Sequence, residues 1–179
     1  MGENPSPFWF HSRAVPGCDE AEPWRRCGMA TSLHIKDAKD LTREPPRSPR
    51  LRLGGYVIMA RMIDKGRAAI SGTAGEYNFD CPVDSSLFEF KGVTGDEVRQ
   101  VIASGASDEE ILAWIDHNGT PKTEAEIKAW SAGSEAVRPY DNPEKREWFM
   151  GECRRLGLDP ERTTLFEYLD IDDRKMFNK

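Results

Sequence analysis

Signals for the start of a helix recur along the chain, and they are the feature that most limits its fold. At Thr94, Ser107 and Thr123 a hydroxyl residue stands three positions before a glutamate, at the start of an expected helix. This is a capping box, in which the hydroxyl accepts a hydrogen bond from the first turn and the glutamate reaches back to the cap. Asn142-Pro143 and Asp159-Pro160 give a related signal, a cap followed by proline at the first helical position.

These signals predict an all-α fold, a compact bundle of about six or seven short helices. Ser48-Pro49 marks the start of the first helix, and Asp84 is expected to cap the second. The only strand candidate, Glu76–Phe79, is too short to found a sheet, so we expect at most a very short strand near 76–79. The helices are expected at 50–71, 85–91, 95–104, 108–117, 124–132, 143–156 and 160–169.

The chain divides into a tail and one domain. Residues 1–28 hold four prolines and show neither a helical nor a strand period, which predicts a disordered N-terminal extension. Met29 begins a more regular stretch and is a second possible start codon, so whether residues 1–28 are translated in vivo stays open. Residues 36–177 are expected to form a single helical domain, and 179 residues are enough for one ordinary core.

Charge and cysteine content exclude several classes of function. A net charge of −6 argues against nucleic-acid partners and anionic membranes, and no apolar run approaches the ~20 residues that span a bilayer. The four cysteines form no C-x-x-C pair and only three histidines accompany them, so we expect no metal site and no cofactor. Free thiols in a reducing cytoplasm are the simplest account of these cysteines. The common phosphate-binding, zinc and hydrolase motifs do not occur.

The densest chemistry lies between Pro46 and Asp84. When Val57–Ile70 is projected as a helix, one broad face is apolar and Gly66 lies in its middle. A glycine inside a helix costs about 1 kcal/mol relative to alanine. We therefore expect another element to pack closely against Gly66. The apolar residues of this face are Ile58, Met59, Met62, Ile63, Ala69 and Ile70.

The opposite face of this helix is charged. Asp64 lies three positions from Arg61 and from Arg67, so one carboxylate could bridge two guanidiniums. One interpretation is a solvated face with ion pairs worth roughly 0–1 kcal/mol each, and the spacing favours it. The other is an anion site, in which Lys65 adds positive charge and Arg47, with Arg50 or Arg52, approaches from the preceding turn.

The segment that follows, residues 75–84, has the composition of a site loop. It combines acids, a phenol, a thiol and turn-forming residues, and such loops often carry function. Glu76, Tyr77 and Cys81 are the candidate catalytic residues. Cys81 would be a nucleophile only beside a cation that activates the thiol, whereas a lone cysteine before proline is more often a small buried apolar residue.

Several blocks of the sequence resemble a family of small bacterial proteins known as the domain of unknown function DUF5069. The likeness covers roughly residues 36–177 and excludes the tail. It implies a bacterial cytoplasmic protein and carries no catalytic assignment over to this chain. The resembling blocks are Asp40-Leu41-Thr42, Pro46-Arg47-Ser48-Pro49, Leu53-Gly54-Gly55-Tyr56, Arg61-Met62-Ile63-Asp64-Lys65, Gly75-Glu76-Tyr77, Cys81-Pro82 with Asp84, Ala113-Trp114, Leu156-Gly157-Leu158-Asp159-Pro160 and Thr163-Thr164-Leu165-Phe166.

Two hypotheses of function follow. The first is a small accessory or binding protein that recognises an anionic ligand or a protein partner through a face on helix 50–71. The alternative is an enzyme that acts on a small anionic substrate in a pocket between helix 57–70 and loop 75–84, which requires the two to converge on one hollow. Neither the ligand nor the oligomeric state can be read from the sequence. The candidate ligand-binding residues are Arg47, Arg61, Asp64, Lys65 and Arg67.

Overall fold

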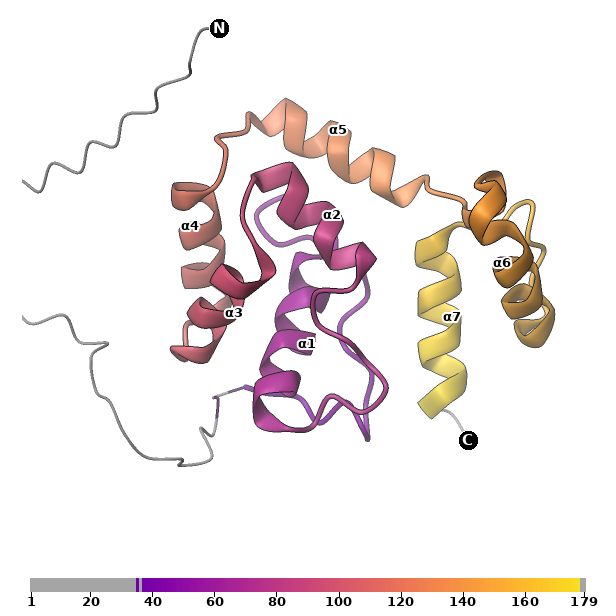
Figure 1. Cartoon of the computed structure of the whole chain (residues 1–179), viewed down its shortest axis with the longest axis horizontal. Helices are drawn as coiled ribbons and strands as arrows, with labels where there is room; N and C mark the ends of the chain where they lie inside the picture. The colour runs from indigo at the N-terminus through magenta and orange to yellow at the C-terminus, as the bar shows by residue number, and fades with distance from the viewer. Residues whose placement is uncertain (1–34, 36, 178–179) are drawn as a thin grey trace, which may run out of the picture.

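The computed structural model describes residues 35 and 37–177, and there the chain is all-α, as predicted (Figure 1). The segment expected to be a disordered tail, residues 1–28, lies outside the described residues. None of the helices described is long and apolar enough to cross a membrane. The helices are α1 (Met59–Ser71), α2 (Pro82–Lys91), α3 (Gly95–Ala103), α4 (Asp108–Asn118), α5 (Glu124–Glu135), the 3-10 turn η1 (Pro139–Asp141), α6 (Pro143–Leu156) and α7 (Leu165–Phe177).

The first helix begins later than predicted, at Met59 and not at residue 50. Leu53 and Tyr56 exchange two backbone hydrogen bonds of 3.0 Å, which closes a tight turn. That turn needs positive φ at both central residues, and Gly54 (59°) and Gly55 (87°) supply it. No side chain caps α1, so its start carries no signal of the kind used to find the others.

Three further boundaries differ from the sequence prediction. α2 begins at Pro82, with Cys81 as its N-cap, so Asp84 lies inside the helix and does not cap it. α5 continues through Gly133 to Glu135. The prediction of a helix at 160–169 is wrong, because residues 159–163 form a turn and α7 runs from Leu165 to Phe177. The Thr164 hydroxyl accepts a hydrogen bond from the Glu167 N–H and marks the true start.

The three predicted capping boxes all form. Thr94, Ser107 and Thr123 each accept a hydrogen bond from the backbone N–H of the glutamate three residues later, and each glutamate bonds back to the cap. Asn142 also caps α6 from the position before Pro143, accepting from the Glu144 N–H at 2.9 Å. At each of these four helix starts the cap and the N–H group that it binds lie within three residues of each other, so the sequence is sufficient to locate them.

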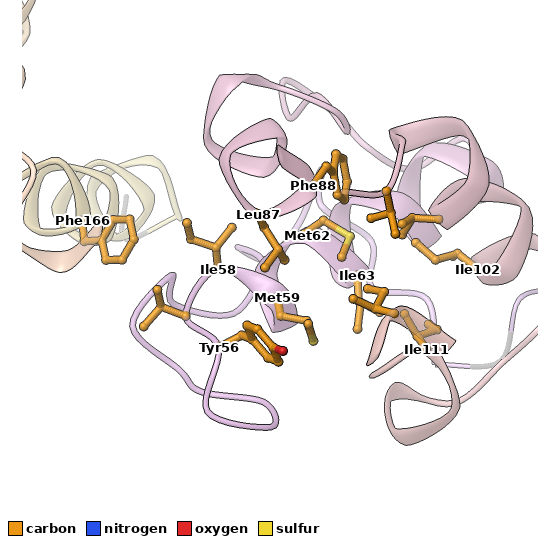
Figure 2. Close-up of a cluster of buried hydrophobic side chains, with 14 residues drawn as sticks. Tyr56, Ile58, Met59, Met62, Ile63, Leu87, Phe88, Ile102, Ile111 and Phe166 are labelled. Atoms are coloured by element: carbon orange, nitrogen blue, oxygen red, sulfur yellow. The ribbon is translucent and has the colours of Figure 1, made fainter. Parts of the chain in front are cut away.

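The main core surrounds α1. Figure 2 shows α1 side chains in the middle of a cluster to which α2, α3, α4 and α7 each contribute. A second, smaller cluster joins α6 to α7 and contains Phe149, Cys153, Leu156 and Tyr168. The labelled members of the main cluster are Tyr56, Ile58, Met59, Met62, Ile63, Leu87, Phe88, Ile102, Ile111 and Phe166.

Other elements pack closely against Gly66 of α1, as predicted. A Cβ at this position would lie 2.5 Å from Cδ1 of Ile102 in α3 and 3.1 Å from the Phe79 ring. The absence of a side chain therefore lets α3 and the 75–84 loop pack directly onto the α1 backbone.

α5 crosses from α4 to α6 over one end of this core (Figure 1). Trp130 stacks on Phe90 of α2, with ring centroids 4.9 Å apart. The Ser131 hydroxyl is buried and donates to the carbonyl of Gly55, at 3.0 Å. α5 thereby covers the turn that precedes α1.

Candidate functional site

The charged residues of α1 are buried, so the interpretation as a solvated face is wrong. Their exposed fractions are only 3% to 5%, and each side chain meets an opposite charge from another part of the chain. A helix surrounded on all sides buries its polar face only if that face is paired. The four residues are Arg61, Asp64, Lys65 and Arg67.

Asp64 binds Arg47 and does not bridge the two arginines of its own helix. The Arg47 guanidinium donates to Asp64 through Nη2 at 2.8 Å and Nε at 3.0 Å, and the Arg47 backbone N–H donates to the same carboxylate at 2.8 Å. Arg47 Nη2 also donates to the Ala60 carbonyl, at 3.1 Å. Arg47 therefore fastens the segment before α1 to the middle of the helix.

Asp108, in the first turn of α4, accepts ion pairs from both Arg47 and Arg67. The Arg67 Nη1 lies 2.7 Å from Oδ1, and the Arg47 Nη1 lies 2.5 Å from Oδ2. Burial would raise the pKa of the Asp108 carboxyl, but the hydrogen bond and charge of Arg47, with the charge of Arg67, outweigh it and hold the pKa below its ordinary value. A carboxylate of the protein thus already occupies the space between these guanidiniums.

Arg61 pairs with Asp173 of α7. The two guanidinium donors lie 2.6 Å and 3.2 Å from the carboxylate oxygens, and both side chains are buried. The Tyr77 hydroxyl donates to the same carboxylate at 2.8 Å. Burial and the bond to Asp173 raise the pKa of Tyr77 above its ordinary value. Tyr77 is therefore a hydrogen-bond donor at neutral pH and is poorly suited to act as a general base.

Lys65 lies between Asp84 and Cys81. Its ammonium is 2.8 Å from Asp84 Oδ1, donates to the Cys81 sulfur at 3.2 Å and donates to the Asn78 carbonyl at 3.0 Å. Asp84 is fully buried, and burial raises the pKa of its carboxyl above the ordinary value, although the Lys65 charge acts in the opposite direction. The three groups form a chain of thiol, ammonium and carboxylate, which we call the Cys81–Lys65–Asp84 relay.

A hollow of about 240 Å³ opens where α1, the 75–84 loop and α7 meet. The pocket that the enzyme hypothesis required thus exists, and it contains all three candidate catalytic residues. Its lining also includes Asp172, Asp173 and Met176 of α7, which the sequence does not place near this loop. The sequence-predicted residues along it are Arg61, Lys65, Glu76, Tyr77 and Cys81.

The other predicted ligand-binding residues lie elsewhere. Arg47, Asp64 and Arg67 line a separate hollow of about 370 Å³ beside the start of α4. The five candidates are therefore divided between two separate hollows beside α1.

A larger groove of about 770 Å³ adjoins the small pocket, between the 75–84 loop and the α6–α7 pair. Its surface is mostly apolar, with Trp148 and Val137 about half exposed along it. The sequence does not indicate this groove, because α6 and the segment before it lie more than 50 positions from the loop. The residues common to groove and pocket are Glu76, Asn78, Cys81, Val83 and Leu169.

The sequence did not identify Asp84 as the partner of Lys65, or Asp173 as the partner of Arg61. Asp84 follows Cys81 by three positions, a helical spacing that brings the two together once the helix is known to start at Pro82. Asp173 is different, because it reaches Arg61 only through the docking of α7 onto α1. Within the described residues no group of three potential metal ligands occurs.

The sequence matches the profile of the family described as "Domain of unknown function (DUF5069)" over residues 43–175. No curated protein matches it. The match spans most of the chain, including α1, the 75–84 loop and nearly all of α7, so both the relay and the pocket lie inside the family domain. This chain belongs to the DUF5069 family.

Proposed function

We propose that this protein acts on a small molecule through the thiol of Cys81, in the pocket formed by α1, the 75–84 loop and α7. The Cys81–Lys65–Asp84 relay is the observation that carries the proposal. A nucleophile within hydrogen-bond reach of a second group, which a third group holds in place, is the arrangement found in covalent catalysis. Here Lys65 Nζ lies 3.2 Å from Cys81 Sγ and 2.8 Å from Asp84 Oδ1.

The position of Cys81 supports the same role. The residue is only half-buried, it lines the pocket, and it stands at the N-cap of α2, where the helix dipole favours negative charge. The thiolate is the reactive form of cysteine, and a neighbouring ammonium stabilises it. Asp84 pairs with the Lys65 ammonium and holds it beside the sulfur, because an unpaired ammonium in this buried place would be costly.

The reaction that this geometry suits is acyl transfer from a carbonyl compound. The sulfur of the thiolate forms a bond to the carbonyl carbon, and the π electron pair moves to the oxygen. Two N–H groups of Lys65 stay bonded to Asp84 and to the Asn78 carbonyl, and the third, which had donated to the sulfur, can then donate a hydrogen bond to this oxygen. When the pair returns, the bond to the leaving group breaks and the acyl group remains on sulfur. Water then hydrolyses the thioester, releasing the acid and regenerating the thiol.

The burial of the α1 charges supports the enzyme hypothesis more than the binding hypothesis. A binding protein that used an open face of α1 would need that face at the surface, whereas Arg61, Asp64, Lys65 and Arg67 are at most 5% exposed. In the pocket, Asp84 and Asp173 already balance Lys65 and Arg61. We therefore favour an uncharged carbonyl substrate over a small anionic one. The anionic substrate, a protein partner and a bacterial cytoplasmic setting stay predictions from the sequence.

A first experiment measures the reactivity of Cys81. Iodoacetamide alkylation, followed by mass spectrometry of the peptides, gives separate rates for Cys81 and for the buried Cys153 of the same sample. We expect Cys81 to react faster than the thiol of free glutathione at pH 7. The double variant Lys65→Met/Asp84→Asn removes both charges together and should slow Cys81 on the order of 10-fold.

A control is available in a second lysine–aspartate pair, in which the lysine is buried and the aspartate is exposed. Lys91 and Asp116 lie 2.9 Å apart, and neither belongs to the relay. Lys91→Met/Asp116→Asn should leave the Cys81 rate unchanged. If both double variants slowed Cys81 equally, the effect would come from general destabilisation, and the relay would have no role.

A second experiment looks for the acyl enzyme. With p-nitrophenyl acetate, the wild-type protein should release a burst of one equivalent of nitrophenol, which is the kinetic sign of a covalent intermediate. Cys81→Ser should abolish the burst, and the intact mass should show one acetyl group only in the wild type. Equal bursts from both proteins would contradict the proposal.

A further inference from the structure

We infer that the apolar groove beside Cys81 binds the apolar body of the substrate, so that the preferred substrates are uncharged carbonyl compounds with an aromatic or alkyl group. This inference rests on the proposed function and adds the substrate class. Its basis is continuity: Cys81, Glu76 and Asn78 line both the small pocket and the groove. A molecule whose carbonyl carbon reaches the sulfur would therefore lay its remaining atoms along the groove.

The groove has the size and surface of a small-molecule site. Its volume of about 770 Å³ lies within the range of roughly 300–1,000 Å³ that such sites occupy. Trp148 is 51% exposed and Val137 is 46% exposed, so large apolar groups face water along this groove. An exposed apolar surface with a polar rim is typical of binding sites.

Trp148 is held in position to form one wall. Its ring packs edge-on against Tyr168 of α7, with centroids 5.9 Å apart, and it also contacts Phe149 of the α6–α7 core. Tyr168 is itself fixed by a hydrogen bond of 3.0 Å to Glu152. The indole therefore offers apolar area without needing to be ordered when a ligand arrives, which lowers the entropic cost of binding.

The charges around the groove favour an uncharged body. Arg138 is paired with Asp141 at 2.8 Å, and the remaining ionic groups of the rim, Glu76, Glu144 and Lys145, carry both signs. No single sign of charge dominates the groove lining as described. A ligand with a charged tail would therefore gain little from this surface, whereas an aromatic or alkyl tail would bury its area against Trp148 and Val137.

The test compares two alkylating reagents of the same chemistry. Iodoacetamide and N-phenyl iodoacetamide transfer the same carbon to sulfur with loss of iodide, but only the second carries an apolar group. The rate at Cys81 is measured for each reagent and divided by its rate with glutathione, which removes intrinsic reactivity. In the wild type we expect the normalised rate for the phenyl reagent to exceed that for iodoacetamide about 10-fold.

Variants locate the preference on the groove. Trp148→Ala removes the wall, and Val137→Asp places a charge beside it, so either should bring the ratio of the two normalised rates towards one. Leu51→Ala is the matched control, because Leu51 is equally exposed, at 47%, and does not line the groove. Circular dichroism establishes that each variant is folded, which is expected for side chains that are half exposed.

The possible outcomes separate this inference from the proposed function. If Cys81 reacts readily but shows no preference for the phenyl reagent, the groove does not bind the substrate body and the proposed thiol chemistry still stands. The same result would follow if the groove received a protein segment and not a small molecule. If Cys81 is inert towards both reagents, the proposed function fails and the inference fails with it. A preference that survives in Trp148→Ala and in Val137→Asp would also overturn the inference.

Discussion

The guanidinium of Arg61 and the carboxylate of Asp173 form two hydrogen bonds, at 2.6 Å and 3.2 Å, although the residues are 112 positions apart. This buried pair joins α7 to α1, and it places α7 as one wall of the pocket that contains Cys81. The chemistry near Cys81 is thus held together by ion pairs of α1 with the remainder of the chain.

Removing one partner of the Arg61–Asp173 pair should lower the free energy of unfolding strongly. Arg61→Met leaves the Asp173 carboxylate buried, with Tyr77 as its one remaining donor among the residues that the structure describes, and such losses cost about 3–5 kcal/mol. Urea unfolding of Arg61→Met should show a loss of that order in the free energy of unfolding. Arg61→Met/Asp173→Leu should recover part of it, and the exposed Arg162→Met should change little. Equal stability of wild type and Arg61→Met would contradict the burial of this pair.

Gly66→Ala should destabilise the protein, against the usual preference of helices for alanine. The new Cβ would lie 2.5 Å from Ile102 and 3.1 Å from Phe79, so the packing of α3 on α1 has to shift, and overpacked cores typically lose about 1–3 kcal/mol. Gly151 in α6 is the control, because a Cβ there meets no atom within 4 Å. Gly151→Ala should therefore stabilise by roughly 0.5–1 kcal/mol.

A third variant tests whether the Gly66 effect comes from this contact. Ile102→Val removes the Cδ1 atom that the new methyl group would meet. Gly66→Ala/Ile102→Val should therefore be less destabilised than the sum of the two single variants, measured by urea unfolding. Simple additivity would show that the loss arises elsewhere.

Asp108 should contribute to the acid sensitivity of the fold. Its pKa is below the ordinary value in the folded protein, so the folded state binds its proton less readily than the unfolded state does. The stabilisation is therefore fully present above the ordinary aspartate pKa of about 3.9 and is lost as the pH falls through the lower, folded value. Urea unfolding between pH 6 and pH 2.5 should show a shallower decline in Asp108→Asn than in the wild type. The exposed Glu89→Gln should retain the wild-type slope; an equal slope in Asp108→Asn would count against the ion pairs with Arg47 and Arg67.

Ser107 offers a test of the capping signals themselves. Its hydroxyl accepts from the Glu110 N–H at 3.2 Å, so Ser107→Ala leaves that donor without its partner and should cost about 0.5–2 kcal/mol. Ser107→Gly should lower the free energy of unfolding by only about a few tenths of a kcal/mol, because water can reach the exposed N–H. Thermal unfolding of both variants checks the order, and a glycine variant less stable than the alanine variant would contradict it.

The sequence alone determined what depends on neighbouring residues. The three capping boxes, the Asn142-Pro143 start and the close approach at Gly66 were predicted correctly, because the groups involved lie within one helical turn or follow from helical periodicity. The late start of α1 was missed for the same reason: no side chain caps it, and a turn at Gly54-Gly55 precedes it.

Only the tertiary structure decided the partners of the α1 charges. The i,i+3 spacing of Arg61, Asp64 and Arg67 indicated ion pairs within the helix, but a buried charge binds whichever opposite charge the packing brings within reach. That packing brings Asp173 to Arg61 and Arg47 to Asp64. The reason is one of distance along the chain, since loop closure, and not local preference, places groups that are 17 or 112 residues apart.

The candidate site shows the same division. From the sequence, residues 75–84 could be recognised as a segment rich in reactive side chains, and Cys81 as a nucleophile that needs a cation nearby. Which cation that would be, and whether a hollow would form around it, depended on α1 turning Lys65 towards the loop and on α7 closing the other side. The composition of the loop is a property of the sequence. The Cys81–Lys65–Asp84 relay depends on the tertiary structure, because a buried ammonium is stable only where the packing places acceptors and an opposite charge around it.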